Sequence, residues 1–390
     1  MNLIKNTLGL WVVLNFITLP FPYHFTPRFG ELVSELVFPL TRSMANAFGI
    51  HLELITFSSD SVIYFMQGLL LIVPAVIFSI VISKTKLITN EKWSELIHTS
   101  ITFFLAFFLL KYGADKIFKH QFYDAEPNIL FTPVGHLSKD ILFWTSMGSS
   151  YTYNLFMGII EIIPAILLLW RKTRLLGAII SVGVLGNVLV LNFSFDITVK
   201  LLSSLLFFSS IFVLSKYFKL LWSVFISHQT VNSTNENEAI QTSTKKRVIK
   251  GGIIALFVIE TFLPVINSGN LNDDNSFKIA YYGAYNIENK PAKSLLFRNA
   301  KRMYIHSKGY LIIETIHETF KDYPISSSTI SNEINLFEEN IKIKVIEKNG
   351  YSILKWSESN TNYLSKITKI ELDSLPVMKD EFNWFLESQY

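Results

Sequence analysis

One carboxylate, Glu161, falls near the middle of a largely apolar run from Tyr151 to Trp170. A helix over this run would place Glu161 roughly 15 Å from its first residue, at 1.5 Å per residue. A carboxylate at that depth in an apolar environment has to be protonated or paired, and it indicates a functional site by default. Pro164 frees a backbone carbonyl in the same helix, although an ordinary kink explains it equally well.

Further polar side chains fall in or next to the neighbouring apolar runs. Asn187 lies in the next run, and Asn192, Asp196 and Lys200 follow at intervals that would place them on one face of a continuous helix. Lys116 lies at the outer end of an earlier run. We therefore predict a polar, outward-opening pocket with Glu161 at its floor. Its candidate ligand-binding residues are Glu161, Lys116, Asn187, Asn192, Asp196 and Lys200.

Each of the residues around Glu161 also has a purely structural interpretation. Asp196 can cap the N-terminus of the helix that follows it. Lys116 and Lys200 can extend their amines to lipid headgroups. Asn187 can hydrogen-bond to a neighbouring helix. The sequence leaves both interpretations open.

Several classes of chemistry are excluded by the composition. The chain has no cysteine, which excludes thiol nucleophiles, CxxC redox pairs, cysteine-ligated iron–sulfur clusters and c-type haem attachment. It has no HExxH, GxSxG or Gly-rich phosphate motif, and its histidines are scattered, so we expect no metal site. The net charge of +4 is small for 390 residues. Without a basic stripe, nucleic acid is not an expected partner.

The composition is typical of a membrane protein. Only 17% of the residues are charged and 50% are hydrophobic, whereas soluble domains have about 25% charged residues. A bilayer core requires roughly 20 apolar residues per helix. Seven candidate spans follow: Ile4–Leu19, Val62–Ser83, Trp93–Leu110, Tyr151–Trp170, Leu175–Phe193, Asp196–Leu214 and Val248–Ile266.

One further apolar segment, Phe29–Phe48, is interrupted by charged residues and a proline. This pattern predicts an amphipathic helix on the membrane surface, with a re-entrant segment as the alternative.

Lysine and arginine residues predict the orientation of these spans. The connections at residues 84–92, 171–174 and 216–250 are basic, and such connections face the cytoplasm. The N-terminus is then cytoplasmic and the C-terminal domain extracytoplasmic. Lysines in the outer loop Lys111–Ser150 argue in part against this orientation. The polar residues 227–247 predict a disordered cytoplasmic linker.

The last third of the chain changes character and predicts a soluble β-rich domain. Asn349-Gly350 separates two alternating segments, which is a strong hairpin signal. Ser307–Gly309 separates a second pair, and Met378–Leu386 is expected to be helical. The predicted fold is therefore a polytopic α-helical membrane protein of about seven spans with an antiparallel β-rich domain.

The predicted organisation has four parts. It consists of a transmembrane bundle over 1–226, the linker at 227–247, a final span at 248–266 and an extracytoplasmic domain over 275–390.

Several short sequence motifs between about Phe103 and Val213 suggest a family. They are Tyr-Gly-Ala-Asp-Lys at 112–116, Gln-Phe at 121–122, Glu-Ile-Ile-Pro-Ala at 161–165, Arg-Lys-Thr-Arg-Leu-Leu-Gly at 171–177 and Asn-Phe-Ser-Phe-Asp at 192–196. Through them the chain resembles the DoxX-like family of bacterial integral membrane proteins, as a long variant with an extra C-terminal soluble domain. Phe57-Ser58-Ser59-Asp60 is similar to a Gly-Ser-Gly-Asp motif of such variants, with Ser58 in place of glycine.

The resemblance implies a four-helix membrane bundle over about 95–215. It implies no activity, although some relatives are linked to quinone-coupled oxidation or redox complexes.

The function predicted first is an accessory or binding protein of the cell envelope, located in the cell membrane. Its pocket would hold a lipid- or quinone-like ligand, and its outer domain would engage an envelope partner. The alternative is a subunit of a quinone-linked membrane oxidoreductase, in which Glu161 exchanges a proton and Lys116 or Lys200 stabilises the anionic form. That subunit would need a membrane redox partner. A transporter fits less well because no inverted repeat is visible.

Whether the chain is an enzyme stays open at this point. We identify no catalytic residue, and no cofactor is evident, although a quinone would fit.

Overall fold

The chain divides into two compact units in the computed structural model. Residues 2–19, 29–51, 60–85, 88–228, 244–275, 278–289, 291, 293–328, 333–336, 341–358 and 361–379 are described. One unit, the helical unit, comprises Met1–Gln121 and Leu155–Leu271; the other, the barrel unit, comprises Phe122–Asn154 and Asn272–Tyr390. Each unit is therefore assembled from two separate stretches of chain.

The helical unit identifies the chain as a membrane protein. Its helices are α1 (Asn2–Thr18), α2 (Phe29–Ala47), α3 (Val62–Leu70), α4 (Ile72–Thr85), α5 (Asn90–Ile117), α8 (Tyr151–Leu169), α9 (Arg174–Ser194), α10 (Lys200–Leu214), α11 (Phe218–Phe225) and α12 (Thr244–Ser268). Within the described ranges, six helical segments are long and apolar enough to cross a membrane. They are Val62–Thr85, Asn90–Ile117, Tyr151–Leu169, Arg174–Ser194, Lys200–Phe225 and Arg247–Asn275.

Several helix boundaries differ from the predicted ones; α5, for example, extends from Asn90 to Ile117 and not from Trp93 to Leu110. Leu71 separates α3 from α4, but its backbone stays helical, so the predicted span from Val62 continues as one helical segment to Thr85. The predicted span from Asp196 begins only at Lys200, because Asp196 has a φ of 56° that no α-helix accommodates. The remaining predicted span corresponds to α1, a shorter apolar helix.

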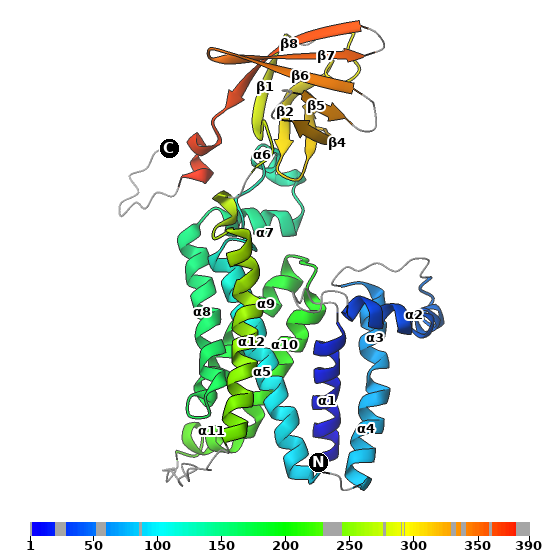
Figure 1. Ribbon diagram of the computed structural model, residues 1–390, viewed down its shortest axis with the longest axis vertical. Helices are drawn as coiled ribbons and strands as arrows, with labels where there is room; N and C mark the ends of the chain where they lie inside the picture. The colour runs from blue at the N-terminus through cyan, green and yellow to red at the C-terminus, as the bar shows by residue number, and fades with distance from the viewer. Residues whose placement is uncertain are drawn as a thin grey trace. The chain divides into compact units, whose positions relative to one another are not determined.

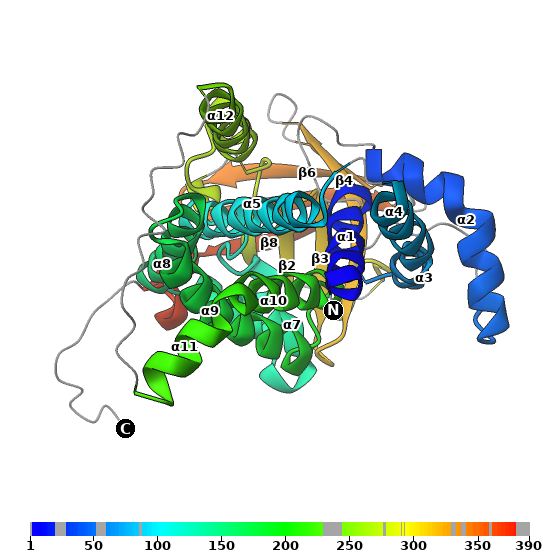
Figure 2. The same cartoon turned by 90° about the horizontal axis from the view of Figure 1, so that it is seen from below.

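Helix α5 forms the centre of the helical unit. It packs against α1, α10 and α12, and α10 packs against α9 (Figures 1 and 2). Its side chains Ile101, Leu105, Phe108 and Leu109 are almost fully buried. Because the helix is apolar on several faces, it can bury against several neighbours at once.

The predicted amphipathic segment forms α2. Its buried face carries small residues, Gly30, Ser34, Thr41 and Ala45, and the Ser34 hydroxyl donates to the side-chain oxygen of Gln67 on α3 at 2.7 Å. Its large apolar residues Phe29, Leu32, Leu36 and Leu40 are exposed. This arrangement is the reverse of a helix in a soluble protein, where the apolar side faces the core.

The barrel unit contains a closed antiparallel barrel of eight strands in the order β1 to β8 (Figure 1). The strands are β1 (Gly283–Glu288), β2 (Ala300–His306), β3 (Tyr310–Thr315), β4 (Phe320–Ser328), β5 (Glu333–Leu336), β6 (Ile341–Lys348), β7 (Tyr351–Glu358) and β8 (Thr361–Ile370). Alternate residues of these strands point inward and fill the barrel around Trp356, Phe297 and Met303. The prediction of an antiparallel β-rich domain is confirmed.

Both predicted hairpins are present. Lys348 pairs with Tyr351, so Asn349 and Gly350 form a two-residue turn. Gly350 has a φ of 85°, in the left-handed region that favours glycine. His306 pairs with Tyr310 across the second turn.

The predicted outer loop contributes a layer to the barrel unit. It forms α6 (Pro127–Leu130) and α7 (Lys139–Gly148). Phe131 stacks on Tyr304 of β2 with ring centroids 5.8 Å apart. The Glu126 carboxylate accepts hydrogen bonds from the hydroxyl and the backbone N–H of Ser307.

Two predictions concern residues outside the described ranges. The predicted linker 227–247 lies outside them from 229 to 243, and the predicted helix Met378–Leu386 lies outside them from residue 380 on.

Candidate functional site

The Glu161 carboxylate forms a buried ion pair with Lys116. The Lys116 Nζ atom lies 2.9 Å from Glu161 Oε2, and the two side chains are only 6% and 3% exposed. Lys116 comes from the last turns of α5 and Glu161 from the middle of α8. A carboxylate in an apolar run requires a partner, and for Glu161 that partner is Lys116.

Two glycines allow the ion pair to form. Gly113 and Gly158 lie three residues before Lys116 and Glu161, on the same helix faces, where α5 and α8 meet. A methyl group at Gly113 would lie 2.8 Å from the carbonyl oxygen of Gly158, and one at Gly158 would lie 2.6 Å from that of Gly113. Only glycine permits this backbone approach, as small residues do at membrane helix contacts.

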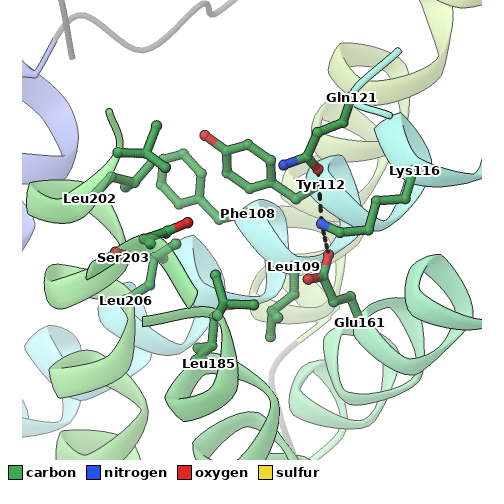
Figure 3. A pocket seen from close by; sticks show the side chains of 13 residues that line it. Phe108, Leu109, Tyr112, Lys116, Gln121, Glu161, Leu185, Leu202, Ser203 and Leu206 are labelled. Atoms are coloured by element: carbon green, nitrogen blue, oxygen red, sulfur yellow. Dashed lines mark hydrogen bonds and ion pairs between the residues drawn. The ribbon is translucent and has the colours of Figure 1, made fainter. Parts of the chain in front are cut away.

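Lys116 also contacts Gln121 and Tyr112. Its Nζ atom donates to Gln121 Oε1 at 2.8 Å, and it lies 5.9 Å from the centroid of the Tyr112 ring. Gln121 follows the end of α5, whereas Tyr112 lies one turn earlier on that helix. Figure 3 shows the ammonium group between the carboxylate of Glu161 and the amide oxygen of Gln121.

A pocket adjoins the Lys116–Glu161 pair. It contains about 460 Å³ of space free of protein atoms, its open mouth included. Residues of α5, α8, α9 and α10 supply its walls. The apolar lining consists of Phe108, Leu109, Leu185, Val188, Val199, Leu202 and Leu206, and the polar lining of Tyr112, Lys116, Gln121, Glu161, Asn192 and Ser203 (Figure 3).

The polar lining retains hydrogen-bonding capacity. Within the part of the chain that the structure describes, neither the Tyr112 hydroxyl nor the Asn192 side-chain amide has a hydrogen-bond partner. The Ser203 hydroxyl donates to the carbonyl of Lys200 at 3.1 Å. The pocket thus offers a hydroxyl and an amide beside an apolar wall, as sites for amphipathic small molecules do.

Three of the six predicted site residues, Lys116, Glu161 and Asn192, line this pocket together. Asn187 lies on α9 with an exposed side chain and is not among the lining residues. Asn192, Asp196 and Lys200 do not share the face of one continuous helix, because α9 ends at Ser194 and the chain turns at Asp196.

Asp196 and Lys200 form a separate arrangement at the start of α10. Lys200 Nζ lies 2.7 Å from Asp196 Oδ1 and 3.9 Å from Asp60 Oδ2. Asp196 is not the N-cap of α10; that position is Val199, whose side chain makes no capping hydrogen bond. The carboxylate of Asp60 accepts from the backbone N–H groups of Lys200 and Leu201 instead.

Three polar pocket residues and one capping residue were not among the predicted site residues. Tyr112 lies four residues before Lys116, and this helical spacing was the signal that could have revealed it. Gln121 and Asp60 lie in two of the short motifs that carry the family resemblance, but their contacts, like the position of Ser203, depend on tertiary packing. No group of three or more potential metal ligands is found among the described residues.

Comparison with known proteins gives a similarity over part of the chain. No family model matches the chain, and no solved structure matches it. The chain is similar to an uncharacterized protein, YwoB of Bacillus subtilis (strain 168), at 38% identity over 103 residues. The match covers 26% of this chain and 65% of YwoB, so the chain spans less than two thirds of that relative.

Proposed function

We propose that this chain is an accessory or binding protein of the cell envelope that holds a lipid- or quinone-like amphiphile in the pocket beside Lys116 and Glu161. The observation that carries the proposal is the division of the pocket lining. One wall is hydrocarbon, and the other presents an ion pair, a hydroxyl and an amide. A molecule with a polar head and an apolar body matches both walls.

The Lys116–Glu161 pair determines which interactions would bind the polar head of the ligand. Because the two charges neutralise each other, the site offers hydrogen bonds more than net charge. The Tyr112 hydroxyl and the Asn192 amide would bond to the oxygens of the head. The apolar body would lie against Leu185, Leu202 and Leu206, with a gain of about 25 cal/mol for each Å² removed from water.

The proposal extends to the architecture. The four helices that supply the pocket, α5, α8, α9 and α10, fall within the stretch that resembles the DoxX-like bundle. We include α1 as a seventh span, with the N-terminus in the cytoplasm and the barrel outside it. The basic residues of the α8–α9 turn support this orientation.

The buried ion pair also favours a second candidate function, a subunit of a quinone-linked oxidoreductase. A carboxylate paired with a lysine beside a bound quinone can exchange a proton with it while the lysine stabilises the anionic form. Such a subunit requires an electron donor from another protein. Its distinguishing result is copurification of both a quinone and a redox partner.

Ligand retention in matched variants tests the binding proposal. The protein is purified in mild detergent, and the small molecules that remain bound are extracted and identified by mass spectrometry. Asn192→Leu removes a pocket amide, whereas Asn187→Leu makes the same change on the exposed face of α9. Loss of one good hydrogen bond of about 1.4 kcal/mol predicts roughly tenfold lower retention for Asn192→Leu alone.

Retention of one amphiphile by wild type and Asn187→Leu, but not by Asn192→Leu, supports the proposal. Equal retention by all three proteins contradicts it, as does recovery of bulk phospholipid alone.

A further inference from the structure

A group of cations surrounds the C-terminal end of α8, away from the pocket. Lys250 of α12 donates from its Nζ atom to the carbonyl oxygen of Leu169 at 2.6 Å. Arg174, the first residue of α9, donates from Nε to the carbonyl oxygen of Leu168 at 3.1 Å. Two cations from different helices thus bond to adjacent carbonyls, where the helix dipole also favours positive charge.

A third cation, Arg171, lies in the turn between α8 and α9. Its guanidinium group pairs with Glu95 of α5 at 3.2 Å, and both side chains are more than half exposed. Arg171 and Arg174 each act electrostatically on Lys250. Among the described residues, Glu95 is the carboxylate that pairs with a member of this group, and the helix C-terminus supplies only about half a negative charge. The group keeps an excess of positive charge.

The residues around this group are of the types found at a membrane–water interface. Trp170 is 50% exposed, and the Lys250 Nζ atom lies 6.0 Å from the centroid of its ring. Ile253 and Leu256 are exposed one and two turns after Lys250 on α12, a helix that lies beside α5 in Figure 2. Exposed apolar side chains and a tryptophan thus lie next to the cations. This combination is typical of a bilayer interface.

We propose that Arg171, Arg174 and Lys250 bind the phosphate of an acidic phospholipid whose acyl chains lie along the exposed faces of α8 and α12. Arginine and lysine at this depth are the groups that recognise acidic headgroups in membranes. Glu95 competes with the phosphate for Arg171. The site is independent of the Lys116–Glu161 pocket, since the two share no residue.

Native mass spectrometry of the full chain in neutral detergent tests the proposal. Phosphatidylglycerol and phosphatidylcholine with identical acyl chains are added separately, and the bound fractions are compared. Wild type is expected to bind phosphatidylglycerol at least about fivefold more tightly, the gain associated with one lysine or arginine near an acidic lipid. Lys250→Gln and Arg171→Gln should each reduce that preference.

Two further variants separate lipid binding from a structural role. Glu95→Gln removes the competing carboxylate and should strengthen phosphatidylglycerol binding, which loss of a stabilising contact alone would not do. Lys219→Gln removes an exposed lysine of α11 with the same change in charge and should have no effect. Lys250→Arg should retain binding. If Lys250→Gln does not accumulate, Arg171→Gln and Glu95→Gln, both at exposed positions, still decide the matter.

Inorganic phosphate serves as the second probe. If phosphate alone displaces phosphatidylglycerol at equal concentration, the site recognises a free anion, and the lipid assignment is overturned. Equal binding of the two phospholipids, or an unchanged preference in Arg171→Gln and Glu95→Gln, also overturns it.

Discussion

The carboxylate of Asp60 caps the first turn of α10 at Lys200, 140 residues later in the chain. Its Oδ2 atom accepts from the Lys200 N–H at 2.9 Å, and its Oδ1 atom accepts from the Leu201 N–H at 3.1 Å. The pocket residues Val199 and Leu202 flank these two positions. One wall of the pocket is thus fixed by a side chain that precedes α3.

Replacing this cap should weaken the helical unit. Asp60→Ala leaves two N–H groups of α10 without their acceptor, and we expect a loss of about 1–2 kcal/mol in stability. Thermal unfolding in detergent measures the loss. Asp60→Asn keeps one acceptor oxygen and should lose less. A melting temperature for Asp60→Ala equal to that of wild type would show that water replaces the carboxylate.

Breaking the buried ion pair should cost more than removing it. Glu161→Gln leaves the buried ammonium group of Lys116 without its carboxylate, which typically costs about 3–5 kcal/mol. Replacing both residues, Lys116→Met with Glu161→Leu, should restore much of the stability while ligand retention stays lost. The unfolding temperature and the bound-ligand content are measured on the same samples. A double variant that retains the ligand would exclude a binding role for the pair.

The glycine contact between α5 and α8 can be tested with a matched substitution. Gly158→Ala would place a methyl group 2.6 Å from a backbone oxygen of α5, whereas Gly183→Ala on α9 meets nothing within 4 Å. We expect Gly158→Ala to destabilise by about 1–3 kcal/mol through overpacking. Gly183→Ala should be neutral or stabilising by up to about 1 kcal/mol. Similar thermal unfolding of the two variants would contradict the close approach.

Lowering the pH should destabilise the barrel, because Glu358 becomes protonated. Burial of this carboxylate acts to raise its pKa, but hydrogen bonds from the Ser294 hydroxyl, the Trp356 indole and the backbone N–H groups of Leu295 and Leu296 outweigh burial and lower the pKa. Because the folded pKa lies below the unfolded value of about 4.3, the contribution is complete above that pH and is lost as the pH falls through the folded pKa.

A hydrogen-exchange pulse at one fixed pH, after incubation at each test pH, measures this loss in β7 peptides. In Glu358→Gln the exchange should be higher at neutral pH and should depend less on acid. A wild-type profile that parallels the variant's at every pH would refute this role of Glu358.

Local patterns predicted the elements of this fold. Six of the predicted apolar runs form helices long and apolar enough to cross a membrane, and alternation around Asn349-Gly350 predicted β6 and β7. Both patterns can be recognised because helix and strand periods appear among neighbouring residues. Closure of the barrel by β1 and β8 could not be predicted in this way, since those strands lie far apart in sequence.

In the candidate site, too, local patterns predicted the residue types, whereas the contacts between distant residues could not be predicted. The sequence predicted that Glu161 requires a partner, because an unpaired charge is costly in hydrocarbon. That Lys116 is the partner follows from the contact between Gly113 and Gly158, which is tertiary. The turn at Asp196 contains neither glycine nor proline, so the local sequence did not show that the next helix begins at Lys200 and not at Asp196.

Closure of the barrel restricts how another protein can bind to this domain. Each of the eight described strands has two hydrogen-bonded neighbours, so none presents a free edge to which a partner could add a strand. Any partner of this domain must therefore recognise side chains on the loops or on the outer sheet surface. The same closure prevents edge-to-edge aggregation, an advantage for a β domain held at high local density on a membrane.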